Sequence, residues 1–185
     1  MATIPLAERL RPHTLDEYIG QRHLVGEGGV FRRFLATGSV PSFILWGPPG
    51  VGKTTLAKII SSQLDRPFYT LSAVTSGVKD VREVIEKARN QHLFNARPAF
   101  LFIDEIHRFN KSQQDSLLGA VEQGVVTLIG ATTENPSFEV ISPLLSRCQV
   151  YVLKSLDESD LRVLLDRAVG KDEELSKRHV EIRET

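Results

Sequence analysis

The chain has 185 residues, of which 41% are hydrophobic and 25% are charged. This length and composition are typical of one globular domain with a buried core, and they leave room for the start of a second domain. The 23 basic side chains balance the 23 acidic ones, so a DNA contact would need a local basic patch rather than net charge.

Targeting and redox features favour a cytosolic protein. The sequence contains no apolar run long enough to cross a membrane. A secretory signal is excluded because its apolar centre cannot hold the charges of the first twenty residues, namely Glu8, Arg9, Arg11, Asp16 and Glu17. The single cysteine, Cys148, cannot form an internal disulfide, which agrees with a reducing compartment. We therefore expect a cytoplasmic protein without a membrane partner.

Short apolar runs alternate with helical patterns along the chain. Before the first run, Thr14-Leu15-Asp16-Glu17 has the spacing of a capping box and predicts the start of a short helix. The predicted strands are residues 43–46, 68–71, 99–103, 125–131 and 149–153. The predicted helices between them are residues 54–64, 78–90 and 112–121. This order predicts an α/β fold, a three-layer sandwich with a five-stranded parallel sheet covered on both faces.

The region after the last predicted strand is helical at first. Residues 158–169 place apolar side chains at helical spacing, and Gly170 predicts the end of that helix. Residues 171–185 are rich in charge and poor in large apolar groups. We expect this tail to fray, or to belong to a helix that lacks its partner.

The most specific motif follows the first predicted strand and is a P-loop, Gly47-Pro48-Pro49-Gly50-Val51-Gly52-Lys53-Thr54. Its glycines allow the backbone N–H groups to curl around the phosphates of a nucleoside triphosphate. Lys53 would meet the β- and γ-phosphates, Thr54 would offer its hydroxyl to Mg²⁺, and the helix start at Thr55 would direct its positive end at the anion. A glycine-rich turn that binds nothing is the alternative. Strand, loop and helix stand in the order that the mechanism requires, so we predict ATP and Mg²⁺ as ligands.

A second motif is the apolar strand that ends in Asp104 and Glu105. Both carboxylates are expected at the carboxyl edge of the sheet, where α/β proteins place their sites. We predict that Asp104 holds Mg²⁺, directly or through water, and that Glu105 orients and deprotonates the attacking water. The alternative is a strand that ends in two solvated acids. An acid beside the metal-binding aspartate favours hydrolysis over transfer to a small molecule by a kinase.

The motifs together resemble those of the AAA+ ATPases. The P-loop, the two carboxylates, a polar strand end at Thr132-Thr133 and the triplet Ser146-Arg147-Cys148 follow the order of that family. The triplet resembles the one in clamp-loader subunits. Three longer segments, residues 72–79, 105–115 and 130–139, resemble the family of bacterial replication-associated recombination proteins A and of Werner-helicase-interacting ATPases. The resemblance extends from residue 5 to residue 167.

The resemblance implies roles for further residues. Thr133 matches the first sensor, a polar group between the attacking water and the γ-phosphate, and Asn135 is its rival. Arg147 matches the arginine finger that acts on the ATP of a neighbouring subunit, which implies a homo-oligomer. The segment that closes over adenine in this family matches Arg11, Pro12, Tyr18 and Ile19. Packing against a helix is the alternative role of that segment.

The resemblance also implies a domain organisation. Residues 1–153 would form the nucleotide-binding core, and residues 154–185 would begin a helical lid. The family has a second sensor arginine in its lid, which we do not assign here because neither Arg178 nor Arg183 has the surrounding helical pattern. It also has a C-terminal oligomerisation region, for which no residues remain. We therefore expect the chain to be an N-terminal fragment.

The function implied is that of a DNA-dependent ATPase in replication-fork maintenance, recombination and DNA repair, at the nucleoid of the bacterial cytosol. Its implied partners are forked or single-stranded DNA, single-stranded-DNA-binding protein and other replication proteins. The candidate DNA contacts are the basic side chains of Lys79, Arg82, Lys87, His107, Arg108 and Lys111. Acidic neighbours on the same helix favour an ion-paired surface instead. A clamp loader, a branch-migration subunit and a small-molecule kinase are the alternative functions.

Overall fold

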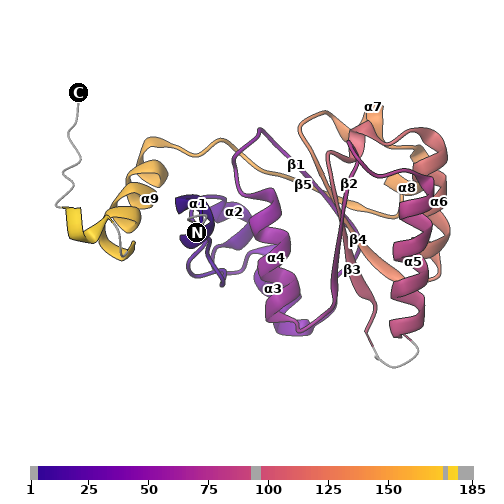
Figure 1. Cartoon of the computed structure of the whole chain (residues 1–185), viewed down its shortest axis with the longest axis horizontal. Coiled ribbons are helices and arrows are strands. Elements are labelled where there is room, and N and C mark those ends of the chain that lie inside the picture. Colours follow the sequence, from indigo (N-terminus) through magenta and orange to yellow (C-terminus); the bar gives the residue numbers. More distant parts are fainter. Residues whose placement is uncertain (1–3, 93–96, 173–174, 179–185) are drawn as a thin grey trace.

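The computed structural model describes residues 4–92, 97–172 and 175–178, and their central element is a parallel sheet (Figure 1). Its strands lie in the order β2-β3-β4-β1-β5 and all neighbouring pairs are parallel. The strands are β1 (Phe43–Trp46), β2 (Phe68–Ser72), β3 (Ala99–Asp104), β4 (Val126–Thr132) and β5 (Gln149–Val152). Every strand boundary lies within one residue of its predicted position. The predicted five-stranded α/β fold is confirmed.

Helices cover both faces of the sheet (Figure 1). One face carries α3 (Val30–Thr37) and α4 (Lys53–Gln63), and the other carries α5 (Val78–His92), α6 (Lys111–Glu122) and α8 (Ser142–Leu145). The remaining elements are α1 (Leu6–Arg9), α2 (Arg22–Val25), the 3₁₀ turn η1 (Ile106–Arg108), α7 (Pro136–Glu139), α9 (Glu158–Lys171) and the 3₁₀ turn η2 (Ser176–Arg178). Among the described helices, none is long and apolar enough to cross a lipid bilayer.

The two layers of the core follow from the alternation of side chains along the strands. In β3, Phe100 and Phe102 pack in the layer of α3 and α4, whereas Leu101 and Ile103 pack in the layer of α5 and α6. All four side chains are essentially inaccessible to solvent. A side chain of this kind contributes about 1.5 to 3 kcal/mol when it is fully buried. The central strands are therefore a rigid platform for the loops that follow them.

Strand register decides which loops meet. Trp46 pairs with both Thr132 and Val152, and Ser72 pairs with Asp104. The P-loop, the two carboxylates and the end of β4 therefore lie together at the carboxyl edge of the sheet. At the other end of β5, Gln149 pairs with Phe43, the first residue of β1.

The predicted helix start at Thr14 was wrong. Residues 13–17 form bends and a turn rather than a helix: the Thr14 hydroxyl accepts the Glu17 N–H at 3.4 Å, and the Glu17 carboxylate accepts the His13 backbone N–H at 2.9 Å. The chain does not continue into a helix after the turn, because Tyr18 is buried and its hydroxyl donates to the Val51 carbonyl oxygen. This long-range contact outweighs the local helix signal.

The predicted end of the last helix at Gly170 was also wrong, since α9 continues to Lys171. A glycine inside a helix costs only about 1 kcal/mol. The helix end is held by Asp172, which is buried and forms two bonds with the Arg9 guanidinium at 2.7 and 3.0 Å. The start of the tail is thus anchored to α1. In the rest of the predicted tail, residues 175–178 are described and contain the turn η2, whereas residues 173–174 and 179–185 lie outside the described residues.

Two adjacent glutamines of α6 connect the segments that follow β2, β3 and β4 at the carboxyl edge of the sheet. Gln113 closes a capping box with Asn110 and donates to the Ser76 carbonyl oxygen at 2.7 Å. Gln114 is 2% exposed, and its amide donates to the carbonyl oxygens of Phe109 and Glu139 and accepts from the Ile141 N–H. The three segments that resemble the recombination proteins are therefore connected through buried amide groups.

Replacing Gln114 by Met should lower the free energy of unfolding by about 2 to 4 kcal/mol, because buried backbone groups lose their partners while the side-chain size is kept. Urea unfolding followed by circular dichroism measures this change. The matched control is Asp115→Asn, an exposed site one residue further on, which should shift stability by less than about 0.5 kcal/mol. Equal stability of the Gln114→Met protein and its parent would contradict the structural role.

Candidate nucleotide-binding and catalytic site

The ends of β1, β3 and β4 bring the predicted site residues together. The Gly47 N–H donates to the Thr132 carbonyl oxygen at 3.1 Å, which fixes the start of the P-loop against the end of β4. Asp104 is the last residue of β3, which lies next to β4 in the sheet. The site is thus built on three strands of the buried core.

The P-loop needs glycine at specific positions. Gly50 and Gly52 have φ angles of 78° and 95°, in the left-handed region that other residues avoid. A Cβ atom on Gly52 would lie 2.5 Å from the Tyr18 hydroxyl, and one on Gly47 would lie 2.5 Å from the Leu153 carbonyl oxygen. A larger residue would be strained at Gly50 and Gly52, and it would collide with Tyr18 at Gly52 and with the Leu153 backbone at Gly47.

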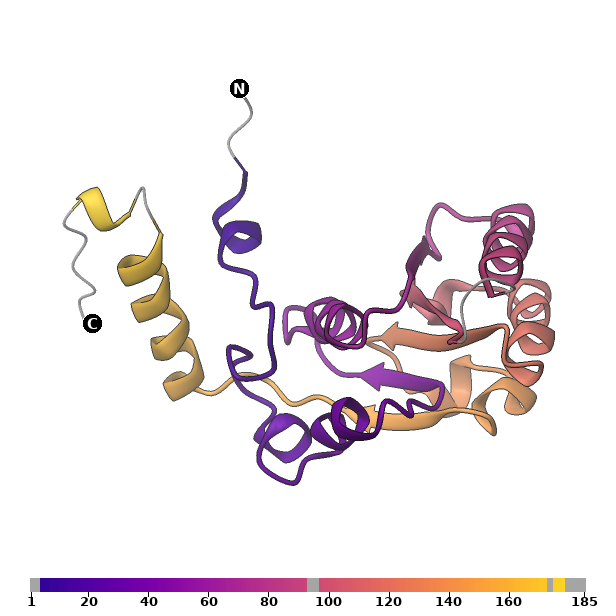
Figure 2. The ribbon, with the colours of Figure 1, turned by 90° about the horizontal axis from the view of Figure 1, so that it is seen from below.

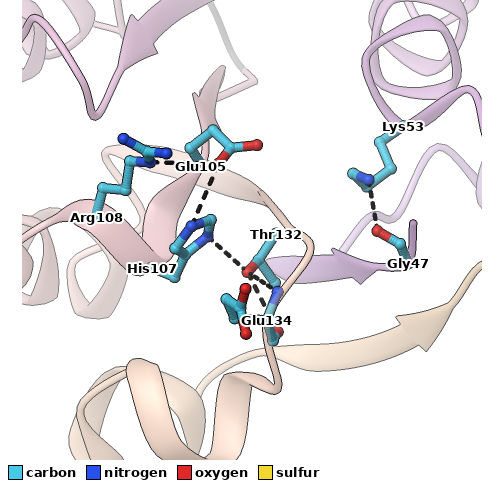
Figure 3. A network of polar contacts seen from close by, with 7 residues as sticks. All are labelled: Gly47, Lys53, Glu105, His107, Arg108, Thr132 and Glu134. Carbon is cyan, nitrogen blue, oxygen red and sulfur yellow. Dashed lines mark hydrogen bonds and ion pairs between the residues drawn. The ribbon is translucent and has the colours of Figure 1, made fainter. Parts of the chain in front are cut away.

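Lys53 occupies the first position of α4, beneath the loop. Its side chain is buried, and Nζ donates to the Gly47 carbonyl oxygen at 2.7 Å (Figure 3). It also donates to the Pro48 carbonyl oxygen at 2.7 Å. Burial lowers the pKa of Lys53, and the negative charges of Glu105 and Asp104 oppose that change. A phosphate in the loop would compete with the two carbonyl oxygens for this ammonium group.

A polar cavity of about 380 Å³ unites most of the predicted phosphate and metal residues. Its walls are formed by Arg11, Pro49, Gly50, Gly52, Lys53, Thr54, Thr55, Asp104 and Glu105. Arg11 and Lys53 provide positive charge for a polyphosphate. Thr54 and Asp104 provide hydroxyl and carboxylate oxygens, the ligand type that Mg²⁺ prefers. The residues present therefore fit a magnesium nucleotide.

A second, more apolar cavity of about 360 Å³ adjoins the first and shares four wall residues with it, Arg11, Gly50, Gly52 and Thr55. The predicted adenine-side residues Pro12, Tyr18 and Ile19 also line it, together with Val51 of the P-loop. Burial raises the pKa of Tyr18 above its ordinary range, so its hydroxyl stays protonated and donates to Val51. Together, the two cavities place apolar walls that suit a base next to polar walls that suit its phosphates.

Some wall residues were not predicted from the sequence. They come from α1 and the residue after it, from the turn at residues 13–17 and from the region of α9, and they are Leu6, Ala7, Leu10, Glu17, Leu156, Leu164 and Arg167. Figure 2 shows the N-terminal segment and α9 side by side, and Arg167 donates to the Glu17 carbonyl oxygen. The helical spacing of Leu164 and Arg167 indicated one face of α9 but not what that face would contact.

The Glu105 carboxylate is held by its own loop. Glu105 has a φ angle of 56°, and the turn η1 that follows places His107 and Arg108 beside it. Glu105 Oε2 lies 3.2 Å from His107 Nε2 and 3.5 Å from Arg108 Nε, and His107 Nδ1 lies 2.9 Å from Thr132 Oγ1 (Figure 3). The contact between His107 and Thr132 was not foreseen from the sequence.

The two sensor candidates differ in what they contact. Thr133 follows the last residue of β4 and is partly exposed. Asn135 caps α7, because its side chain accepts a hydrogen bond from the Ser137 N–H at 3.0 Å. Neither residue lines the two cavities. Thr133 stays the predicted first sensor, since Asn135 already has a structural task.

The structure does not bring Arg147 into this site. Arg147 precedes β5, so it lies at the amino edge of the sheet, opposite the P-loop. Its side chain forms an ion pair with Glu122 and donates to the Pro143 carbonyl oxygen at 2.6 Å. Arg147 is too far along the sheet to serve the nucleotide of its own chain.

Two basic side chains of α5, Lys87 and Arg89, are engaged with acids of the same helix. Lys87 pairs with Glu83 at 3.0 Å, and both side chains are more than half exposed. Arg89 pairs with Glu86 at 3.4 Å. These pairs have the pattern of a solvated, ion-paired surface, which was the alternative to DNA contact.

Comparison with known proteins places the chain among ATPases. Residues 43–156 match the model of the ATPase family associated with various cellular activities (AAA). The replication-associated recombination protein A of Escherichia coli K12 is 54% identical over 165 residues, which cover 89% of this chain and 37% of that protein. A protein of Dictyostelium discoideum named ATPase WRNIP1 is 51% identical over 165 residues, covering 89% of this chain and 19% of its own length.

A solved structure gives the same result for the fold. The Thermotoga maritima RuvB Holliday junction branch migration motor superimposes with a TM-score of 0.73 at 34% identity, covering 94% of this chain and 56% of that one. This chain spans 37% of the length of its Escherichia coli relative. The resemblance to the replication-associated recombination proteins A is confirmed, and the chain belongs to the family of ATPases associated with various cellular activities (AAA).

Proposed function

We propose that the chain is the ATP-binding and ATP-hydrolysing core of a DNA-dependent ATPase in replication-fork maintenance, recombination and DNA repair. The observation that carries the proposal is the pair of adjoining cavities, one apolar and one polar, on either side of Gly50 and Gly52. Membership of an ATPase family and the names of the relatives support it.

In the proposed mechanism, Lys53 leaves the carbonyl oxygens of Gly47 and Pro48 for the β- and γ-phosphates. Thr54 and Asp104 would hold Mg²⁺, which when bound would neutralise charge on the phosphates. Glu105 accepts a proton from the attacking water while the water oxygen bonds to the γ-phosphorus and the bond to the bridging oxygen breaks. The products are ADP and phosphate.

The apolar cavity would hold the adenine base. Pro12 and Ile19 offer apolar walls, and Tyr18 is fixed by its bond to the Val51 carbonyl oxygen. Arg11 connects this cavity to the polar one, where Nη1 donates to Thr55 Oγ1 at 3.0 Å. These four residues would orient the base relative to the phosphates. The P-loop residues Pro48, Pro49 and Val51 serve through their backbone.

ATP turnover by the protein should rise about 5-fold or more with forked DNA. The reason is that bound DNA, as an effector, would raise the population of the catalytically active arrangement. The measurement is steady-state phosphate release with forked DNA, a four-way junction, linear duplex or no DNA, at low and high salt. Equal rates under all conditions would contradict DNA dependence.

A second candidate function is a branch-migration ATPase, which the superposition on a branch migration motor favours. That function predicts that the four-way junction, and not the forked DNA, raises the rate of ATP turnover. A sliding clamp that alone stimulates turnover would instead indicate a clamp loader. Phosphate release without any small-molecule acceptor separates all three from a kinase.

A further inference from the structure

One histidine connects the predicted catalytic carboxylate with the end of β4. His107 is the middle residue of η1, and 13% of its side chain is exposed. Nε2 lies 3.2 Å from Glu105 Oε2, and Nδ1 lies 2.9 Å from Thr132 Oγ1 (Figure 3). The imidazole ring therefore spans two groups that the sequence separates by 27 residues.

The hydrogen-bonding capacity of the partners determines how the ring is oriented. A carboxylate can only accept, so Nε2 must carry the hydrogen that faces Glu105. Nδ1 then accepts from the Thr132 hydroxyl, which receives the Glu134 N–H at 3.0 Å and shares its single hydrogen between Nδ1 at 2.9 Å and the Glu134 carbonyl oxygen at 3.2 Å. Thr132 is fully buried, so it is a fixed partner.

Thr132 is also part of the nucleotide site's framework. It pairs with Trp46 in the sheet, and its carbonyl oxygen receives the Gly47 N–H. Any displacement of the P-loop start relative to β4 would therefore reach His107 through Thr132, and then Glu105. The contact with Arg108 is weaker, because it is 3.5 Å long and the Arg108 side chain is 58% exposed.

We propose that His107 is a positioning residue for Glu105, holding the carboxylate through Nε2–H and taking its own orientation from Thr132. The inference rests on the proposed function, in which Glu105 accepts the proton of the attacking water. His107 and Arg108 contact the same carboxylate oxygen, Oε2, which leaves Oε1 to face the water. His107 lines neither cavity, so it acts on the rate of hydrolysis and not on nucleotide affinity.

The test compares two amides of different reach at position 107. Glutamine places its amide nitrogen near the position of Nε2 and keeps a donor for Glu105, whereas asparagine reaches only as far as Nδ1. His107→Asn and His107→Ala should lower the single-turnover rate about 10-fold to 100-fold, and His107→Gln should retain most of it. The dissociation constant for ATP should stay unchanged in all three. The control His23→Asn, at an exposed histidine of α2, should leave the rate unchanged.

Several outcomes would overturn the assignment. They are full activity of His107→Ala, equal rates for the asparagine and glutamine variants, and a parallel loss of ATP affinity. The Glu105→Gln background separates this inference from the proposed function. If Glu105 is the base and His107 acts through it, adding His107→Ala to Glu105→Gln causes no further loss. If Glu105→Gln by itself hydrolyses ATP like the parent, Glu105 is not the base, and the positioning role of His107 fails with it. If the parent protein releases no phosphate from ATP, the proposed function fails instead.

Discussion

Mixing Arg147→Ala protein with Lys53→Ala protein should restore ATP hydrolysis that neither variant performs alone. Arg147 lies at the amino edge of the sheet and the P-loop at the carboxyl edge, so one chain cannot bring the two together. In a mixed oligomer, an intact P-loop from the first variant faces an intact arginine from the second. An arginine finger contributes on the order of 10³-fold or more in other P-loop enzymes, so Arg147→Ala alone should lose about that factor.

The mixing experiment requires the oligomeric protein and proof of subunit exchange, for example by energy transfer between labelled subunits. Arg89→Ala is the matched control, because Arg89 is exposed on α5 and pairs only with Glu86 among the interactions described for it. It should leave turnover unchanged. The trans role of Arg147 fails if exchange is demonstrated without recovery of turnover, or if Arg147→Ala is as active as the parent.

The second large effect concerns the separation of binding from chemistry at Glu105. Glu105→Gln should lower turnover about 10²-fold or more while ATP remains bound, because glutamine keeps an oxygen for His107 and Arg108 but is not a base. Lys53→Ala should instead weaken ATP binding, since it removes the charge that meets the phosphates. Rapid quench measures turnover, and a fluorescent ATP analogue measures affinity.

Two results would contradict this pair of assignments. Comparable turnover by the glutamine variant and the parent would remove Glu105 from the chemical step. Unchanged ATP affinity of Lys53→Ala would show that the ammonium group stays with Gly47 and Pro48 when nucleotide binds. Thermal unfolding of both variants checks that the fold is retained.

The features that the sequence predicted well are local or periodic. The strands were predicted because β-sheet periodicity and apolar runs are properties of four to seven consecutive residues, and the observed register placed Asp104 at the end of β3 as expected. The P-loop was predicted because its glycines, lysine and threonine act through one short segment of backbone. Local signals were less reliable at Thr14 and Gly170, where distant contacts to Val51 and Arg9 determined the backbone.

The amino-acid sequence by itself determined the succession of strands and helices along the chain, the phosphate-binding loop and the two carboxylates. Each of these depends on neighbouring residues. Only the tertiary structure decided the apolar cavity, whose walls join residues 6–19 to residues 156–167. It also decided the contact of His107 with Thr132 and the separation of Arg147 from the P-loop. These depend on the register of parallel strands and on the packing of distant segments, which local propensities do not specify.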